Sequence, residues 1–372
     1  MRKKAMRVVI CGGGVVGACT AYFLRRHGVD VIVVERTGVA AAASGKAGGF
    51  LARDWCAGTP LDALARHSFK LHAQLPRELP GHWDYRPMSA YSGRVVPEGD
   101  PRRNTRSTFD WLSKGIHIAQ RIGTTETTAI VHPQKFTSAV MNAAIAQGAE
   151  FRHGLFTGIL REAGCTTVKG IGVGDSIIEA DAVVIAMGPW SLLATSWMSL
   201  PALYAQSSPS IVYDTGTHVS ADALFLEMEI HGQVAPIEVF PRPDGTTYVT
   251  ACPDTGAFFT DPAHVEPEPN RMHRLQQMSE RLSPLFRPEK IIAKQACYRP
   301  VTADGSPLIG RVPQEEALYV ATGHGVWGIL NAPATGEALA ELIVEGATRN
   351  VDLAPFDPAR LPPLDLPRRR WP

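Results

Sequence analysis

The chain has 372 residues, 45% of them hydrophobic and 20% charged, so it can bury a sizeable core and exceeds the usual size of one domain. Its 37 basic and 36 acidic residues leave a formal net charge of +1. This balance argues against nucleic acid or an anionic membrane surface as a partner and favours a small molecule. No run approaches the roughly 18 apolar residues of a membrane span. The six scattered cysteines form no Cys-x-x-Cys pair, which favours reduced thiols, a cytoplasmic location and no metal site.

The first elements form around a glycine-rich turn. Residues 8–10 suit a strand buried on both faces, and residues 15–23 carry apolar side chains at helical spacing. Between them, Gly12, Gly14 and Gly17 follow the pattern Gly-x-Gly-x-x-Gly, which permits a tight turn, approach of a pyrophosphate and close helix packing. A second strand ends at Glu35, where a carboxylate can bind a ribose 2′-hydroxyl. The triplet alone also fits a turn without a ligand, but this order of elements predicts a dinucleotide site.

The next segments differ from this alternating pattern. Residues 44–55 combine small residues with apolar and aromatic ones, which suits close approach to a flat ligand, the alternative being a flexible surface loop. Residues 61–75 predict a helix, and the aromatic residues that follow up to about position 128 indicate an inserted part of a second domain.

Strand and helix patterns then return. A helix is expected over 136–145, and residues 180–191 predict an apolar strand, parallel to the first two, that ends in a glycine turn. Short alternating runs between 210 and 260 predict an antiparallel sheet, and a polar amphipathic helix follows over 271–282. Residues 318–321 predict a last strand, which again enters a glycine turn and a helix, at 323–343.

These ordered signatures resemble the D-amino-acid oxidase superfamily of FAD enzymes, which includes glycine oxidase and sarcosine oxidase. The resemblance covers most of the chain and rests on the glycine triplet, Glu35 and residues 44–51, 186–191, 299–310 and 323–336. It implies an α/β fold, with a Rossmann-like FAD-binding domain of the glutathione-reductase-2 type and an antiparallel β-sheet substrate domain. We expect the FAD-binding domain to be discontinuous, over 1–60, 129–205 and 291–372, and the substrate domain to comprise 61–128 and 206–290.

The resemblance also implies FAD rather than NAD. Val15 and Val16 would lie over the pyrophosphate, with Glu35 and Arg36 at the adenosine and Ser44 near the phosphates. Residues 48–50 would line the isoalloxazine ring, and residues 325–329 would wrap its pyrimidine edge. The predicted cofactor-binding residues are Gly12, Gly14, Val15, Val16, Gly17, Glu35, Arg36, Ser44, Gly48, Gly49, Phe50, Gly188, Trp190, Cys297, Gly325, Val326, Trp327, Gly328 and Ile329.

Two arginines are candidates for binding a substrate carboxylate. Amine oxidation at carbon needs a neutral amine, a Cα–H aimed at flavin N5 and a fixed carboxylate. By resemblance, Arg299 stands where glycine oxidase and D-amino-acid oxidase keep their carboxylate-binding arginine, and a guanidinium suits a bidentate grip. The alternative is an ion pair across the domain interface. Arg53 matches the corresponding position of sarcosine oxidases, with a surface salt bridge as its alternative.

Other residues have less specific expected roles. Cys297 falls where sarcosine oxidases attach FAD covalently, although a buried strand cysteine is the commoner arrangement. Trp327 replaces a lysine of sarcosine oxidases, which argues against sarcosine. Lys46 is a candidate for stabilising negative charge near the flavin, or is a solvated loop residue.

Two further residues complete the predicted catalytic set. Tyr248 stands where sarcosine oxidase carries its oxygen-activating lysine, so a dehydrogenase that uses another acceptor is a possible outcome; the alternative is a core aromatic. His324 is a candidate for a hydrogen bond to flavin or substrate, or for stabilising its turn.

The leading hypothesis is an FAD-dependent oxidase or dehydrogenase that oxidises the C–N bond of an amino acid or secondary amine. The alternatives are oxidation of a C–O bond in a hydroxy acid or polyol phosphate, and a non-catalytic flavin-fold interaction protein. The sequence leaves the oligomeric state open.

Overall fold

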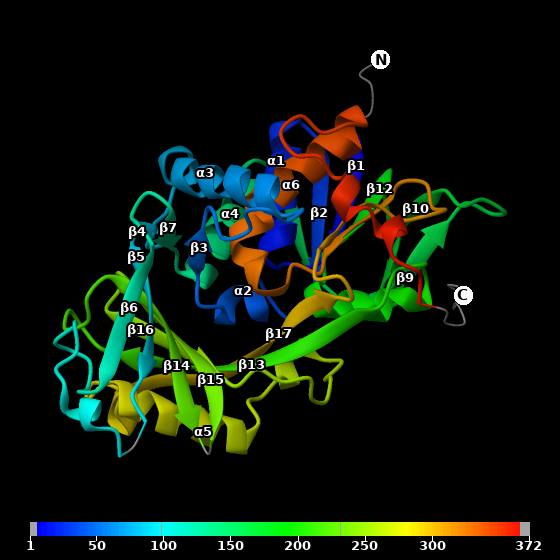
Figure 1. Ribbon diagram of the computed structural model, residues 1–372. Helices are drawn as coiled ribbons and strands as arrows, with labels where there is room; N and C mark the ends of the chain where they lie inside the picture. The colour runs from blue at the N-terminus through cyan, green and yellow to red at the C-terminus, as the bar shows by residue number, and fades with distance from the viewer. Residues whose placement is uncertain (1–5, 98, 231, 365–372) are drawn as a thin grey trace.

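The computed structural model describes residues 6–97, 99–230 and 232–364, so the outer ends of the predicted FAD-binding ranges lie outside it. Two large sheets dominate the molecule, one of six strands and one of seven (Figure 1). Within the described ranges, no helix combines the length and apolarity that crossing a bilayer requires.

The six-stranded sheet has the order β18-β19-β12-β1-β2-β8. The central strand β1 pairs in parallel with β2 and with β12, which is the predicted arrangement of the strand within 180–191. The strand β18 is antiparallel to β19. The bounds are β1 (Arg7–Cys11), β2 (Asp30–Glu35), β8 (Glu150–His153), β12 (Ala182–Ile185), β18 (Leu308–Arg311) and β19 (Leu318–Thr322).

Both faces of this sheet are covered, which explains why its strands are apolar without alternation. Val8 and Ile10 face the helices α1 (Val15–Arg26), α4 (Pro133–Ala146) and α6 (Gly328–Glu345), and α3 (Asp62–Glu78) packs on α6. Val9 and Cys11 face the opposite side. There a small antiparallel sheet covers them, formed by β9 (Phe156–Arg161), β10 (Val168–Val173) and β11 (Ser176–Glu179).

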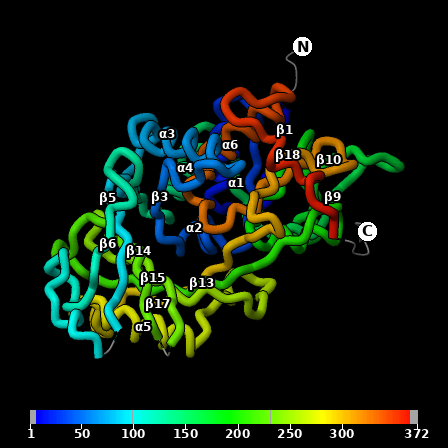
Figure 2. The backbone as a smooth tube through the Cα atoms, in the orientation of Figure 1, coloured from blue at the N-terminus to red at the C-terminus, as the bar shows by residue number. Residues whose placement is uncertain are grey.

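The seven-stranded sheet has the order β17-β13-β16-β15-β14-β5-β6. Its pairs are antiparallel except β14 with β5, so the sheet is mixed rather than purely antiparallel as predicted. It also includes β17, although residue 291 was the predicted start of an FAD-binding range. Figure 2 shows β13 and β17 side by side between the two parts of the molecule. The bounds are β5 (Ser89–Val95), β6 (Ile116–Gly123), β13 (Leu203–Asp214), β14 (Asp222–Ile230), β15 (Gln233–Pro241), β16 (Thr246–Ala251) and β17 (Ile291–Thr302).

The two faces of the seven-stranded sheet have different neighbours. The helix α5 (Pro269–Leu282) buries its apolar stripe against the outer face (Figure 1). The inner face carries Phe225, Phe240 and Tyr248 toward the six-stranded part. The remaining elements are α2 (Ala43–Lys46), the small sheet of β3 (Phe50–Ala52), β4 (Arg86–Pro87) and β7 (Thr128–Ile130), and the 3-10 helices η1 (Pro101–Asn104), η2 (Gly188–Ser196), η3 (Pro262–His264), η4 (Pro288–Lys290), η5 (Gly325–Trp327), η6 (Ala354–Phe356) and η7 (Pro358–Arg360).

Candidate flavin and substrate site

A cavity of about 920 Å³ lies between the carboxyl ends of the parallel strands and the inner face of the seven-stranded sheet. In open α/β sheets this edge is where ligands bind. Gly14, Gly49 and Gly328, one from each predicted glycine turn, all line this cavity. Gly14 and Gly328, which are 314 positions apart in the chain, therefore lie around one space.

Most of the predicted site residues line the cavity, and three do not. Gly17, Lys46 and Arg53 are absent from its wall. Gly17 packs behind it, since a Cβ there would stand 2.0 Å from the carbonyl oxygen of Gly12. The predicted residues on the wall are Gly12, Gly14, Val15, Val16, Glu35, Arg36, Ser44, Gly48, Gly49, Phe50, Gly188, Trp190, Tyr248, Cys297, Arg299, His324, Gly325, Val326, Trp327, Gly328 and Ile329.

The start of α1 is built to accept an anion. Gly12 has a φ of +118°, and a Cβ there would lie 2.3 Å from the carbonyl oxygen of Ala186, so only glycine fits. Ser44 Oγ accepts a hydrogen bond from the Val15 amide at 2.9 Å. In the described chain the amides of Val16 and Gly17 donate to no acceptor, and α1 has no side-chain cap. These free N–H groups at a helix N-terminus are the donors that a phosphate uses.

Glu35 has a role that the sequence did not indicate. Its carboxylate accepts hydrogen bonds from the amides of Gly13 and Thr37, each at 2.7 Å, and so holds the glycine turn in place. It also lines the cavity, and its expected contact with a ribose hydroxyl stays a prediction. The neighbouring Arg36 pairs with Asp261 at 2.5 Å.

Two side chains of α3 form hydrogen bonds with the backbone at the start of α6. Pro333 has no N–H to donate to the carbonyl of Ile329 four residues earlier. The Nε2–H of His72 donates to that carbonyl instead, at 2.9 Å, and Ser68 Oγ accepts from the amide of Ala334 at 3.1 Å. Burial lowers the pKa of His72 to about 4, so its ring is neutral at neutral pH. Because α6 has no side-chain cap and Gly328 lines the cavity, the positive end of the helix dipole faces the cavity.

His324 is a second neutral histidine beside this helix. Its Nε2 lies 3.1 Å from Thr335 Oγ1, and burial lowers its pKa to about 4. The ring lines the cavity, so it is placed both to hold its own turn and to meet a ligand.

Aromatic rings form the wall contributed by the seven-stranded sheet. The ring of Phe240 stacks on Phe50 at 5.4 Å and on Tyr248 at 6.0 Å between centroids. Burial raises the pKa of the Tyr248 hydroxyl to about 12, which keeps it protonated. Behind Tyr248, the Arg242 guanidinium lies 5.3 Å from the ring centroid and donates to the carbonyl of Ala47 at 2.9 Å. Arg242 therefore ties this aromatic wall to the loop that carries Gly48.

Two ionisable side chains of this sheet face the cavity without a fixed partner. Among the described residues, neither the guanidinium of Arg299 nor the carboxyl of Glu238 has a hydrogen bond or an ion pair. Burial raises the pKa of Glu238, while the charge of Arg299 opposes that rise. Burial likewise raises the pKa of the nearby Cys297 thiol.

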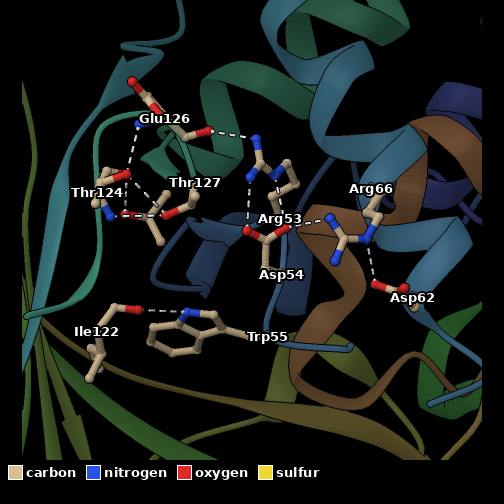
Figure 3. A network of polar contacts seen from close by, with 10 residues as sticks. Arg53, Asp54, Trp55, Asp62, Arg66, Ile122, Thr124, Glu126 and Thr127 are labelled. Atoms are coloured by element: carbon tan, nitrogen blue, oxygen red, sulfur yellow. Dashed lines mark hydrogen bonds and ion pairs between the residues drawn. The ribbon is translucent and has the colours of Figure 1, made fainter. Parts of the chain in front are cut away.

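The structure corrects the predicted role of Arg53. Its guanidinium forms a bidentate ion pair with the neighbouring Asp54, at 2.8 and 2.9 Å, and Arg66 contacts the same carboxylate at 2.6 Å (Figure 3). Arg53 also donates to the carbonyl of Glu126, outside the cavity wall. Arg53 therefore forms the surface salt bridge that was the predicted alternative to carboxylate binding.

Lys46 does not line the cavity either. It ends α2, and its carbonyl oxygen accepts from Gln295 Nε2 at 3.1 Å. Its positive charge is close enough to oppose the rise in the pKa of Cys297.

Several residues on the wall were not singled out from the sequence. Except for Trp55, which follows β3, they share the inner face of the seven-stranded sheet, where period-two alternation could have placed them together. They are Trp55, Ser208, Phe225, Glu238, Phe240 and Thr250.

The fold and the cavity define a dinucleotide-binding protein in which a second sheet lines the cavity at the carboxyl ends of the parallel strands. Residues 7–342 match the family model described as FAD dependent oxidoreductase, DAO, and the chain belongs to this family. It is thus an enzyme whose cofactor is FAD, which confirms the predicted resemblance, fold class and cofactor. The free amides at the start of α1, the uncapped start of α6 and the size of the cavity fit this cofactor.

Relatives and solved structures extend over nearly the whole chain. A protein of Schizosaccharomyces pombe, named as an oxidoreductase, is 28% identical, covering 94% of this chain and 97% of the relative. Glycine oxidase of Pseudomonas putida is 24% identical over 95% of this chain and 98% of its own. The structure of glycine oxidase from Geobacillus kaustophilus has a TM-score of 0.79 with 22% identity, covering 96% of this chain and 99% of that one. At this identity the likeness shows the shared fold.

Proposed function

We propose that the protein oxidises the C–N bond of an amino acid or secondary amine to an imine, which water hydrolyses. Bound FAD supplies the two-electron acceptor for this chemistry. The observation that carries the proposal is the position of Arg299, whose guanidinium faces the cavity of the three glycine turns without an ion pair in the described chain.

A partly buried guanidinium that forms no direct ion pair is costly, because its desolvation is not offset by a contact with a carboxylate. A substrate carboxylate would supply that counter-charge and accept two parallel hydrogen bonds. The carboxylate would thereby be anchored, which sets the direction of the Cα–H bond relative to the flavin.

The aromatic wall supports the same chemistry. Phe50, Phe240 and Tyr248 line the same cavity as Arg299 and make part of its wall apolar. An amine in an apolar environment loses its proton more readily, because desolvation disfavours the ammonium form. The site therefore favours the neutral amine that C–N oxidation requires.

The structural neighbours support a substrate of this class. They include glycine oxidase, L-proline dehydrogenase from P. horikoshii and iminodiacetate oxidase from Chelativorans, with TM-scores of 0.75 to 0.79. Each of these names pairs an amine with a carboxylate, which is the combination that Arg299 and the apolar wall would select.

The test is anaerobic reduction of the bound flavin by amino acids and N-methyl amines. Hydroxy acids are included because they test the alternative, oxidation of a C–O bond. Arg299→Ala should keep FAD but lose kcat/KM by roughly 30-fold or more, since removing one partner of a buried charge pair costs about 2–5 kcal/mol. Arg299→Lys should recover only part of the loss.

Arg53→Ala is the matched control, because Arg53 lies off the cavity wall and pairs with Asp54. It should leave kcat/KM within about twofold of the parent. Flavin reduction by hydroxy acids alone, or an unchanged kcat/KM in Arg299→Ala, would contradict the proposal. Reoxidation by air compared with an artificial acceptor then distinguishes an oxidase from a dehydrogenase.

A further inference from the structure

The carboxyl group of Glu238 forms no contact that stabilises the described fold, and the proposed C–N oxidation assigns it no role. Glu238 lies on β15 with its side chain on the cavity face, two residues before Phe240 and directly opposite Phe225 on β14. Among the described residues its carboxyl has no hydrogen bond and no ion pair, although the residue is partly buried. A buried acceptor left without a donor is costly, so an incoming ligand is the natural source of one.

A second hollow begins at the same residue. A cleft of about 590 Å³ lies over β5, β6, β14 and β15, and Glu238 and Phe225 line it as well as the main cavity. Glu227 and Pro236 lie on the same sheet face as these two residues, since they are two positions away on the same strands. No residue of the three glycine turns lines this cleft. Glu238 and Phe225 therefore stand where the main cavity and this cleft share a wall.

We propose that the substrate is an amino acid with a second, cationic nitrogen on its side chain, and that Glu238 binds this nitrogen while Arg299 binds the carboxylate. The proposal rests on the proposed function, in that Arg299 must hold the carboxylate end. Where the substrate side chain extends beyond Glu238, the second cleft provides space for it.

Three features of the site favour a cation at this position. The carboxylate of Glu238 pairs with an ammonium or guanidinium group through charge-assisted hydrogen bonds. The rings of Phe225 and Phe240 flank it, and aromatic faces attract cations. Arg299 would repel a cation, so the two opposite charges orient a substrate that carries both charges in one direction only.

The first experiment compares kcat/KM for flavin reduction by lysine and by norleucine, which have side chains of similar length with and without the terminal nitrogen, using both stereoisomers. The parent protein should prefer lysine by about tenfold or more. Glu238→Gln should reduce this ratio to within about threefold of unity. Glu229→Gln is the matched control, because Glu229 lies on β14 but lines neither hollow, and it should keep the ratio of the parent.

The second experiment measures binding without turnover. Isothermal titration calorimetry of the FAD-loaded protein with 6-aminohexanoate and with hexanoate should give a Kd about tenfold lower for the aminated ligand, and Glu238→Gln should remove the difference. Equal affinities for the two ligands in the parent protein would overturn the proposal, and this measurement does not depend on whether the variant folds.

The outcomes separate this inference from the proposed function. If no amino acid or amine reduces the flavin, the proposed C–N oxidation fails, whereas the calorimetric preference for the aminated ligand still decides the role of Glu238. If neutral amino acids reduce the flavin as fast as lysine, C–N oxidation stands and the cationic substrate class is refuted. An equal loss of kcat/KM for lysine and norleucine in Glu238→Gln would also overturn the inference, because it indicates a role at the reacting amine.

Discussion

Replacing His72 by leucine tests how the chain positions the start of α6. His72 is fully buried on α3, and its Nε2–H donates to the Ile329 carbonyl that Pro333 leaves without a partner. Leucine has a similar volume but no donor, so the carbonyl would be left buried and unpaired. Such a loss costs about 1–3 kcal/mol of stability near neutral pH. Because Ile329 lines the cavity, the affinity for FAD should also fall.

The same substitution should have the opposite effect in acid. Burial lowers the pKa of His72 from 6.5 to about 4, so the unfolded chain binds a proton that the folded chain refuses between these two values. The stability associated with neutral His72 is therefore present above about pH 6.5 and is lost as the pH falls toward 4. At about 1.4 kcal/mol per pKa unit, the parent should lose roughly 3 kcal/mol over this range that the leucine variant does not lose. At pH 4 the variant should equal or exceed the parent in stability.

The measurement is urea unfolding of the FAD-free protein at pH 7.5 and at pH 4, followed by tryptophan fluorescence, together with FAD titration at pH 7.5. His273→Leu is the control, because His273 is exposed on α5 and its ring forms a hydrogen bond with Gln277 one turn along the same helix. It should shift the free energy of unfolding by less than about 0.5 kcal/mol at either pH. A His72→Leu variant as stable as the parent at pH 7.5, or destabilised equally at both pH values, would refute the reasoning.

Three other substitutions or treatments test the cofactor site. Gly12→Ala should abolish flavin binding, since a Cβ would stand 2.3 Å from the Ala186 oxygen, and the flavin-to-protein absorbance ratio measures this. Acid precipitation should release the colour to the supernatant, because burial raises the pKa of Cys297 and disfavours the thiolate; colour in the pellet would contradict this. Arg242→Met should raise the Kd for FAD several-fold by freeing the Ala47 carbonyl, as measured by fluorescence quenching. An unchanged Kd would show that the bond does not position the loop.

The local patterns of the sequence predicted the six-stranded part well. Strands buried on both faces appear as continuous apolar runs, so β1, β2 and β12 could be found from these local runs. The glycine turns also carry a local signal, because a close backbone approach permits no other residue. The convergence of these turns on one cavity was the expectation from the resemblance.

The seven-stranded sheet was predicted less completely because strand pairing is not a local property. The parallel pairing of β5 with β14 joins segments about 130 residues apart, and nothing in either strand specifies the direction of the other. The orientation of the Arg53 side chain likewise could not be predicted from local sequence. Its partner is the adjacent residue, and only the fold decides whether the guanidinium turns toward Asp54 or toward the substrate.

Gly48 shows how the two sheets together determine the depth of the substrate space. A Cβ on this residue would stand 2.5 Å from Phe240 Cδ2 and 3.0 Å from Tyr248 Cε1, so the flavin loop touches the aromatic wall at this point. Arg242 holds the same contact from behind through its bond to Ala47. The loop that carries Gly48 can therefore lie this close to the inner face of the seven-stranded sheet because residue 48 has no side chain. The packed rings of Phe240 and Tyr248 prevent a closer approach. Any larger residue at position 48 would push the sheet that carries Arg299 and Glu238 away from the flavin, so substrate recognition and cofactor binding depend on one contact.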